Sequence, residues 1–174
     1  MAKQMVEYNK KFELPLITFL EKCLPQSGRV LDIRGRHSFY LDIANQFKVF
    51  WCLFEDEKII GTVAVKELDE ENCELKSLYL LEEYHGLGHG KAMLEKAVSF
   101  AKEVGYHRMY LDSLSTSTKA LGLYSRVGFV DTERYNQNVR SDVFMVLELH
   151  TKNDRSKLLP FNENKSKCLF IRLK

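Results

Sequence analysis

The chain has 174 residues, a length typical of one domain with a substantial core. Its formal net charge of +2 gives no strong field for nucleic acid or an anionic membrane surface, and we expect neither as a partner. The longest unbroken apolar run, residues 49–54, is too short to span a bilayer, and Lys3, Glu7 and Lys10 interrupt any signal-peptide core. These features predict a cytoplasmic protein.

The first third of the chain predicts helices. Apolar residues recur there at three- and four-residue spacing, namely Phe12, Leu16, Phe19, Leu20 and Cys23. Pro25, Ser27 and Gly28 end this segment. We expect a second short helix over residues 38–45, and a short strand over residues 5–8 before both.

Strands are predicted next. Residues 49–54 and 59–65 are apolar and β-branched, and the polar turn between them indicates a hairpin. Residues 73–81 form a third strand, antiparallel to the second because the connection is short.

Helices and strands then alternate. Residues 88–104 predict an amphipathic helix that ends at Gly105. A strand over 108–111, a helix over 119–126 and a closing hairpin of 129–134 and 143–149 follow. This order predicts an α/β (α+β) domain with one mixed, mostly antiparallel central sheet flanked by helices. We assign residues 1–149 to this domain and residues 150–174 to a polar C-terminal extension, which could be a tether, an added strand or a homodimer contact.

Metal chemistry is not expected. The four cysteines are scattered without a Cys-x-x-Cys pair, which favours free thiols. His85 and His89 are four residues apart, but Gly86, Gly88 and Gly90 interleave with them, whereas a metal-binding pair usually sits within a formed helix.

The glycine-rich segment 84–92 follows a strand and begins a helix. Gly86, Gly88 and Gly90 remove Cβ atoms that would block a ligand, and the first amides of a helix have no intrahelical partners. Together with the helix dipole, these amides predict a pyrophosphate site. The alternative is a flexible turn with no ligand.

Two common phosphate motifs do not fit this segment. A Walker A loop would need Gly at position 85 and Ser or Thr at position 92, where the chain has His85 and Ala92. A dinucleotide fingerprint would place its third glycine one residue later than Gly90, and no βαβ pattern precedes it.

The segment resembles the acetyl-CoA-binding motif of the GNAT superfamily of N-acetyltransferases, which reads Arg or Gln, two residues, Gly, one residue, then Gly or Ala. Residues 85–90 match it, with His85 in place of Arg or Gln. A second stretch, Ala120-Leu121-Gly122-Leu123-Tyr124 followed by Gly128-Phe129, is similar to a further motif of the family. The resemblance covers residues 49–149.

The resemblance implies acetyl-CoA as co-substrate and a central strand pair that splays at the cofactor cleft. Backbone groups of Leu78, Tyr79 and Leu80 would pair with the pantetheine amides. The pyrophosphate would bind at the turn, at His85, Gly86, Leu87, Gly88, His89, Gly90 and Lys91. Interior strand packing and solvated helix charges are the alternatives for these groups.

The resemblance also implies three roles near the thioester. Tyr124 would protonate the leaving thiolate, since a phenol with a pKa near 10 suits that step. Its alternative is a half-buried helical tyrosine that packs on the core. Glu74 would accept the amine proton directly or through water, and its alternatives are an exposed strand carboxylate or an ion pair with Lys76. Ser117 would contact pantetheine or only cap the following helix.

The predicted function is transfer of an acetyl group to a primary amine, of a small molecule or a peptide, by direct attack in a ternary complex. The alternative is a non-catalytic acyl-CoA sensor or interaction module on the same fold. The sequence does not identify the acceptor.

Overall fold

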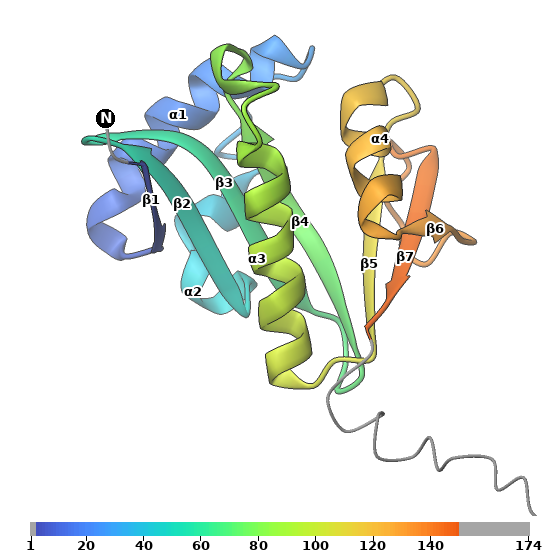
Figure 1. Ribbon diagram of the computed structural model, residues 1–174. Coiled ribbons are helices and arrows are strands. Elements are labelled where there is room, and N and C mark those ends of the chain that lie inside the picture. The colour runs from blue at the N-terminus through green and yellow to red at the C-terminus, as the bar shows by residue number, and fades with distance from the viewer. Residues whose placement is uncertain (1–2, 150–174) are drawn as a thin grey trace, which may run out of the picture.

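The computed structural model describes residues 3–149, which build one seven-stranded sheet in the order β1-β2-β3-β4-β5-β7-β6 (Figure 1). Every neighbouring pair is antiparallel except β4 and β5. The strands are β1 (Lys3–Glu7), β2 (Val49–Glu55), β3 (Lys58–Glu67), β4 (Asn72–Leu80), β5 (Arg108–Ser113), β6 (Val130–Asp131) and β7 (Val143–Glu148). The predicted mixed, mostly antiparallel sheet is confirmed.

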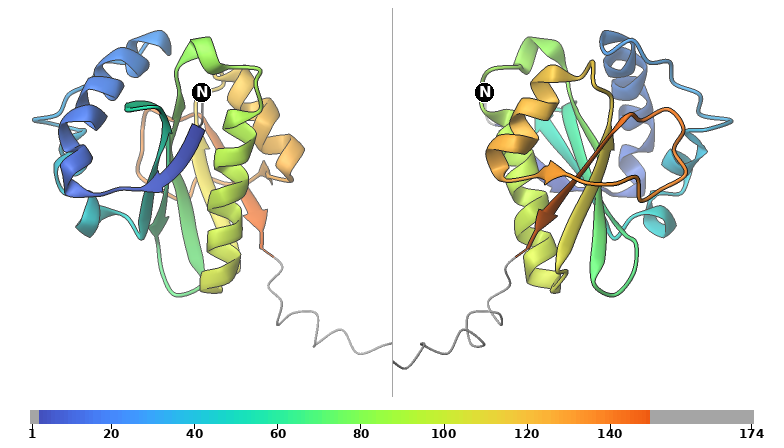
Figure 2. Two further views of the ribbon diagram at one scale, coloured as in Figure 1. Left: turned by 60° about the vertical axis from the view of Figure 1, so that its left-hand side comes forward. Right: turned by 90° about the vertical axis from the view of Figure 1, so that its right-hand side faces the viewer.

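Helices cover both faces of this sheet. Figure 2 shows α1 on one face and α3 and α4 on the other. The helical elements are η1 (Lys10–Phe12), α1 (Glu13–Gln26), η2 (Ser38–Leu41), α2 (Ile43–Gln46), η3 (Glu82–Tyr84), α3 (His89–Val104) and α4 (Thr118–Val127). Within residues 3–149, no helix has both the length and the apolar character that crossing a bilayer requires.

The predicted elements are present with small shifts of their ends. The expected helix over 38–45 is divided into η2 and α2. The expected strand over 129–134 is reduced to the two residues of β6, because the chain leaves the sheet after Asp131 and returns only at Val143. The predicted extension, residues 150–174, lies outside the described residues.

The core lies on both sides of the central strands. β2 is buried over its first six residues, as expected for a strand with helices on both faces. α3 buries one stripe against β3 and β4, formed by Met93, Leu94, Ala97, Val98 and Ala101. This packing fixes the direction in which α3 leaves the end of β4.

β4 and β5 pair over only three positions, from Asn72 opposite Arg108 to Glu74 opposite Tyr110. β4 then continues to Leu80 without β5 beside it, and the two strands diverge (Figure 1). The splay that the family resemblance implied is confirmed. Among residues 3–149, no strand pairs with the β5-facing edge of residues 75–80.

A bulge in β4 lies within this unpaired stretch. Ser77 has a positive φ of 52°, and the register against β3 shifts between Thr62 and Ala64. The Thr62 hydroxyl, which is fully buried, donates to the Ser77 carbonyl at 2.7 Å. The Tyr40 and Ser77 hydroxyls also share a hydrogen bond of 2.8 Å. Two buried hydroxyls therefore hold the bulge.

Replacing Thr62 by Val should lower the free energy of unfolding by about 1–3 kcal/mol, because the Ser77 carbonyl would lose its buried donor. Urea denaturation of the purified protein measures this change. Thr62→Ser keeps the hydroxyl and serves as the control, with a smaller loss expected. Equal losses in the two variants would mean that packing, rather than the hydrogen bond, stabilises the bulge.

Candidate active site

The glycine turn joins the end of β4 to α3. Gly86 and Gly88 have φ values of +77° and +86°, which side chains other than glycine rarely adopt. α3 then begins at His89, and its first helical hydrogen bond runs from the Ala92 amide to the Gly88 carbonyl. Within residues 3–149, the amides of residues 86–91 have no acceptor. The turn therefore offers a run of free donors at the positive end of a helix.

Side chains around this turn are mostly exposed. Leu87 is 62% exposed, and Lys91 forms a loose ion pair with Glu95 at 3.6 Å. The His85 ring turns back to the end of β4, where Nε2 lies 3.0 Å from the Leu80 carbonyl oxygen. Gly90 has an ordinary backbone conformation, and an added Cβ would make only van der Waals contact with Leu123.

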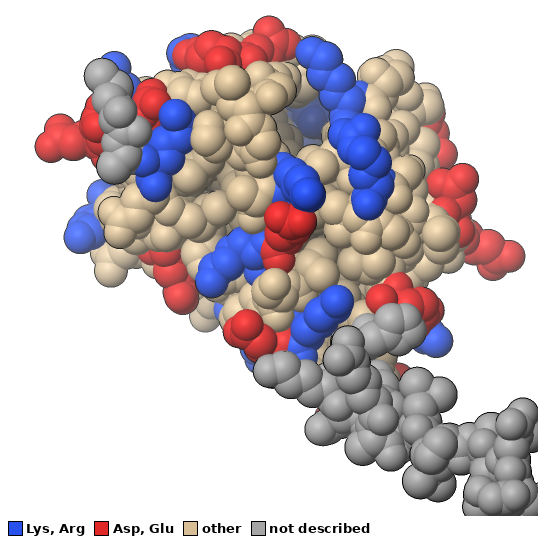
Figure 3. All heavy atoms as spheres, viewed as in Figure 1, with Lys and Arg blue, Asp and Glu red and all other residues tan. Residues whose placement is uncertain are grey.

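A cavity of about 840 Å³ lies beside the splayed part of β4. Leu78 and Tyr79 of β4 line it, with Ser117 and Tyr124 on the α4 side. Figure 3 shows the surface hollowed between the α3 and α4 sides of the molecule, with basic side chains along the edge. The residues of the glycine turn do not line the cavity, but the turn follows directly after the end of β4. One strand thus leads from the cavity to the free amides.

Tyr124 lies at the cavity wall with 7% of its surface exposed. Burial is the main cause that raises the pKa of its hydroxyl, and the nearby Tyr79 adds to the effect. The phenol therefore keeps its proton at neutral pH. Ser117 lies at the N-cap position of α4, but its side chain makes no capping bond. Its hydroxyl is thus available to the cavity.

Glu74 is buried on β4, away from the lining of the cavity. Its side chain is 5% exposed and lies 2.9 Å from the Lys76 ammonium. The Tyr135 hydroxyl donates to the same carboxylate at 2.6 Å, and Asn136 donates to it at 3.3 Å. This geometry matches the ion-pair alternative for Glu74 more closely than a direct base.

Asp112 completes this buried network. It lies 2.7 Å from Lys76, and the side chains of Asn138 and Ser141 donate to it. Burial alone would raise the pKa of Asp112, but the Lys76 charge and these hydrogen bonds lower it to about 2. Asp112 is therefore a weak base, and it anchors the segment between β6 and β7 to β5.

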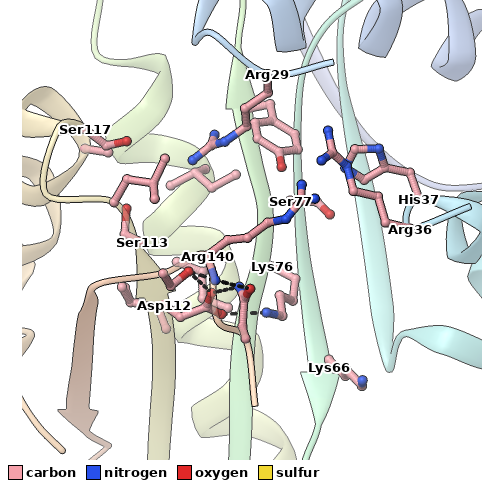
Figure 4. A pocket seen from close by; sticks show the side chains of 18 of the residues that line it. Arg29, Arg36, His37, Lys66, Lys76, Ser77, Asp112, Ser113, Ser117 and Arg140 are labelled. Carbon is pink, nitrogen blue, oxygen red and sulfur yellow. Dashed lines mark hydrogen bonds and ion pairs between the residues drawn. The ribbon is translucent and has the colours of Figure 1, made fainter. Parts of the chain in front are cut away.

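Sequence reasoning missed the basic side chains of the cavity. Figure 4 shows that Arg29, Arg36, Lys66 and Arg140 surround it. They come from the segment after α1, the end of β3 and the segment before β7. No spacing rule links such distant positions, although Arg34-Gly35-Arg36-His37 is a visible basic cluster. In the part of the chain that the structure describes, no group of three His, Cys, Asp or Glu residues could hold a metal.

Comparison with known proteins agrees with this geometry. The model of the acetyltransferase (GNAT) family matches residues 16–129. Human N-acetyltransferase 8B is 33% identical over 129 residues, which are 68% of this chain and 56% of that protein. The chain spans about half the length of the curated relatives it matches, between 37% and 56% for three of them.

Solved structures share the fold. A GNAT-family acetyltransferase of Staphylococcus aureus Mu50 gives a TM-score of 0.78 at 22% identity and covers 86% of this chain and 100% of its own. A GNAT-family acetyltransferase of Elizabethkingia anophelis with acetyl-CoA bound gives 0.64 at 18% identity and covers 84% and 98%. The glycine turn, the splayed strands and the family match lead to one conclusion: this chain belongs to the GNAT family of acetyltransferases.

Proposed function

We propose that the chain transfers the acetyl group of acetyl-CoA to a primary amine by direct attack in a ternary complex. The observation that carries this proposal is the continuous path from the free amides of residues 86–91, along the unpaired edge of β4, to the cavity at Tyr124. A pyrophosphate at the turn would let the pantetheine follow Leu78, Tyr79 and Leu80. The related Elizabethkingia protein, which has acetyl-CoA bound, supports this choice of ligand.

The proposed chemistry depends mainly on placement. The thioester and the amine would meet in the cavity beside Tyr124, so that proximity supplies much of the rate. Amide groups along the open edge of β4 would stabilise the developing oxyanion. Tyr124, which is protonated at neutral pH, would donate its proton to the departing coenzyme A thiolate.

Water is the proposed acceptor of the amine proton. Glu74 is held by Lys76 and Tyr135 away from the cavity lining, so a direct transfer to its carboxylate would need this network to open. The His37 ring is also an unsuitable base. Its Nδ1 accepts a hydrogen bond from the Asp32 amide at 2.9 Å, so Nε2 carries the hydrogen and neither ring nitrogen is free to take a proton.

Replacing Gly88 by Val should weaken acetyl-CoA binding about tenfold or more, because a β-branched residue cannot keep φ near +86° without strain. Gly105→Val is the matched control and should bind nearly normally, since Gly105 also has a positive φ, of +102°, but lies at the opposite end of α3. Calorimetric titration with acetyl-CoA measures both variants, and thermal unfolding checks that they are folded.

No acetyl-CoA binding by the unmodified protein would overturn the proposed function. Unchanged binding in Gly88→Val would move the pyrophosphate away from the turn, and equal losses in Gly88→Val and Gly105→Val would mean that strain in α3, rather than a lost phosphate contact, weakens binding. Coenzyme binding without turnover of any amine would favour the alternative of a non-catalytic acyl-CoA sensor.

A further inference from the structure

Positive charge is concentrated around the cavity. Five cationic side chains line it, whereas Asp112 is the one carboxylate among the lining residues; the five are Arg29, Arg36, Lys66, Lys76 and Arg140. Lys76 is neutralised by Glu74 and Asp112. The cavity therefore keeps a positive excess, although the whole chain is close to neutral at +2.

Four of these cations have no carboxylate within salt-bridge distance among residues 3–149: Arg29, Arg36, Lys66 and Arg140. Cations elsewhere, such as Lys48 and Arg108, do have such partners. Like charges around one cavity raise its potential and attract an anion. The four cations without a carboxylate partner therefore indicate that the cavity binds an anion.

Arg140 and Arg36 enter the cavity from opposite sides (Figure 4). The Arg140 backbone is held because its amide donates to Asn138, and both Asn138 and Ser141 donate to the buried Asp112. The Arg36 amide donates to Asp32 at 3.2 Å, and its guanidinium donates to the Val30 carbonyl. Each arginine is therefore held within its own segment through its backbone amide, and among residues 3–149 neither guanidinium forms an ion pair.

His37 adds a neutral donor next to Arg36. Because its Nδ1 accepts the Asp32 amide, Nε2 carries the hydrogen. Burial is the main cause that lowers the pKa of His37, so the ring stays neutral at pH 7. Two guanidinium groups and one N–H donor in a cavity suit a carboxylate, which accepts planar paired hydrogen bonds from arginine.

The coenzyme phosphates are a less suitable occupant for these cations. The free amides of residues 86–91 supply the proposed pyrophosphate site, and none of those residues lines the cavity. Figure 4 places Ser117 at one end of the cavity and Lys66 at the other, with Arg140 between them. The end toward Lys66 is therefore left for the acceptor.

We infer that the acceptor is a small primary amine that carries a carboxylate, an amino acid or a close analogue, with Arg140 and Arg36 binding that carboxylate. This inference rests on the proposed acetyl transfer. The cavity volume of about 840 Å³ lies in the range of small-molecule sites. Polycationic amines are excluded by the same charges.

The test measures coenzyme A release by the purified full-length chain with acetyl-CoA and a panel of amines. The panel contains glutamate, phenylalanine, glutamine, the carboxamides of the last two, and spermidine. We expect kcat/KM to be about tenfold higher for phenylalanine and for glutamine than for the carboxamide of each, and lowest for spermidine. Arg140→Gln should remove most of this difference through KM, while Lys102→Gln, which changes an exposed charge of α3 outside the cavity lining, should keep it.

Each other outcome has a separate meaning. Equal or higher kcat/KM for carboxamides or spermidine would overturn the carboxylate inference and leave acetyl transfer intact. Turnover of no amine in the panel, with acetyl-CoA still bound in calorimetry, would also overturn it. A carboxylate preference that survives Arg140→Gln and Arg36→Gln would refute the assignment of these two residues. Absence of acetyl-CoA binding would refute the proposed function itself.

Discussion

Tyr124→Phe is expected to lower kcat by about 10²–10⁴-fold, the range for loss of a general acid, and to leave acetyl-CoA binding nearly unchanged. The phenol is buried at the cavity wall, and its raised pKa keeps it protonated across the neutral range. Phenylalanine preserves the ring packing against Phe129, whose centroid lies 5.9 Å away, and removes only the proton donor. Steady-state kinetics with calorimetry of acetyl-CoA binding measures the two effects separately.

Tyr110→Phe is the control for this substitution. Tyr110 is a half-buried tyrosine of β5 that does not line the cavity. Its hydroxyl should be dispensable for turnover. A kcat for Tyr124→Phe that matches the Tyr110→Phe value would mean that Tyr124 only packs in the core and that another group or solvent protonates the thiolate.

Asp112→Asn is expected to lower the free energy of unfolding by about 2–3 kcal/mol at pH 7, because the pKa of Asp112 is about 2 in the fold and its ordinary value is 3.8. Because the pKa is lowered in the fold, the stabilisation is fully present above about pH 4. It is lost as the pH falls toward 2. Urea denaturation of both proteins across this range should show their difference shrinking with acid.

Glu148→Gln provides the comparison. Glu148 pairs with Arg108 at 2.9 Å, but both side chains are about half exposed, and such pairs contribute about 0–1 kcal/mol. Equal effects of Asp112→Asn and Glu148→Gln would show that the buried network around Lys76 contributes no more than a surface pair.

The parts of the fold that follow local patterns could be predicted from the sequence. The helix over residues 88–104 and the hairpin of β2 and β3 depend on periodicity and turn residues, and both lie where the sequence predicts them. The glycine turn was also recognisable, because positive φ at Gly86 and Gly88 requires glycine.

Other features depend on contacts between distant segments. The short β6 and the position of Glu74 are examples, since residues 132–142 carry no periodic pattern, and Tyr135 and Asn136 reach Glu74 only in the folded chain. Arg36 and Arg140 meet at one cavity for the same reason. The fold and the glycine turn were therefore more predictable than the basic residues that line the cavity.

The anchoring of the segment between β6 and β7 has a consequence for how such a protein can diverge. This segment is tied to β5 through Asp112 and carries Arg140, whereas the glycine turn belongs to β4 and α3 on the other side of the splay. Substitution of Arg140, whose side chain bonds to neither Asp112 nor Glu74, can thus alter what enters the cavity, whereas Tyr135 and Asn136 of the same segment are bound to Glu74 of β4. The side chain at position 140 and the glycine turn can therefore change independently of one another.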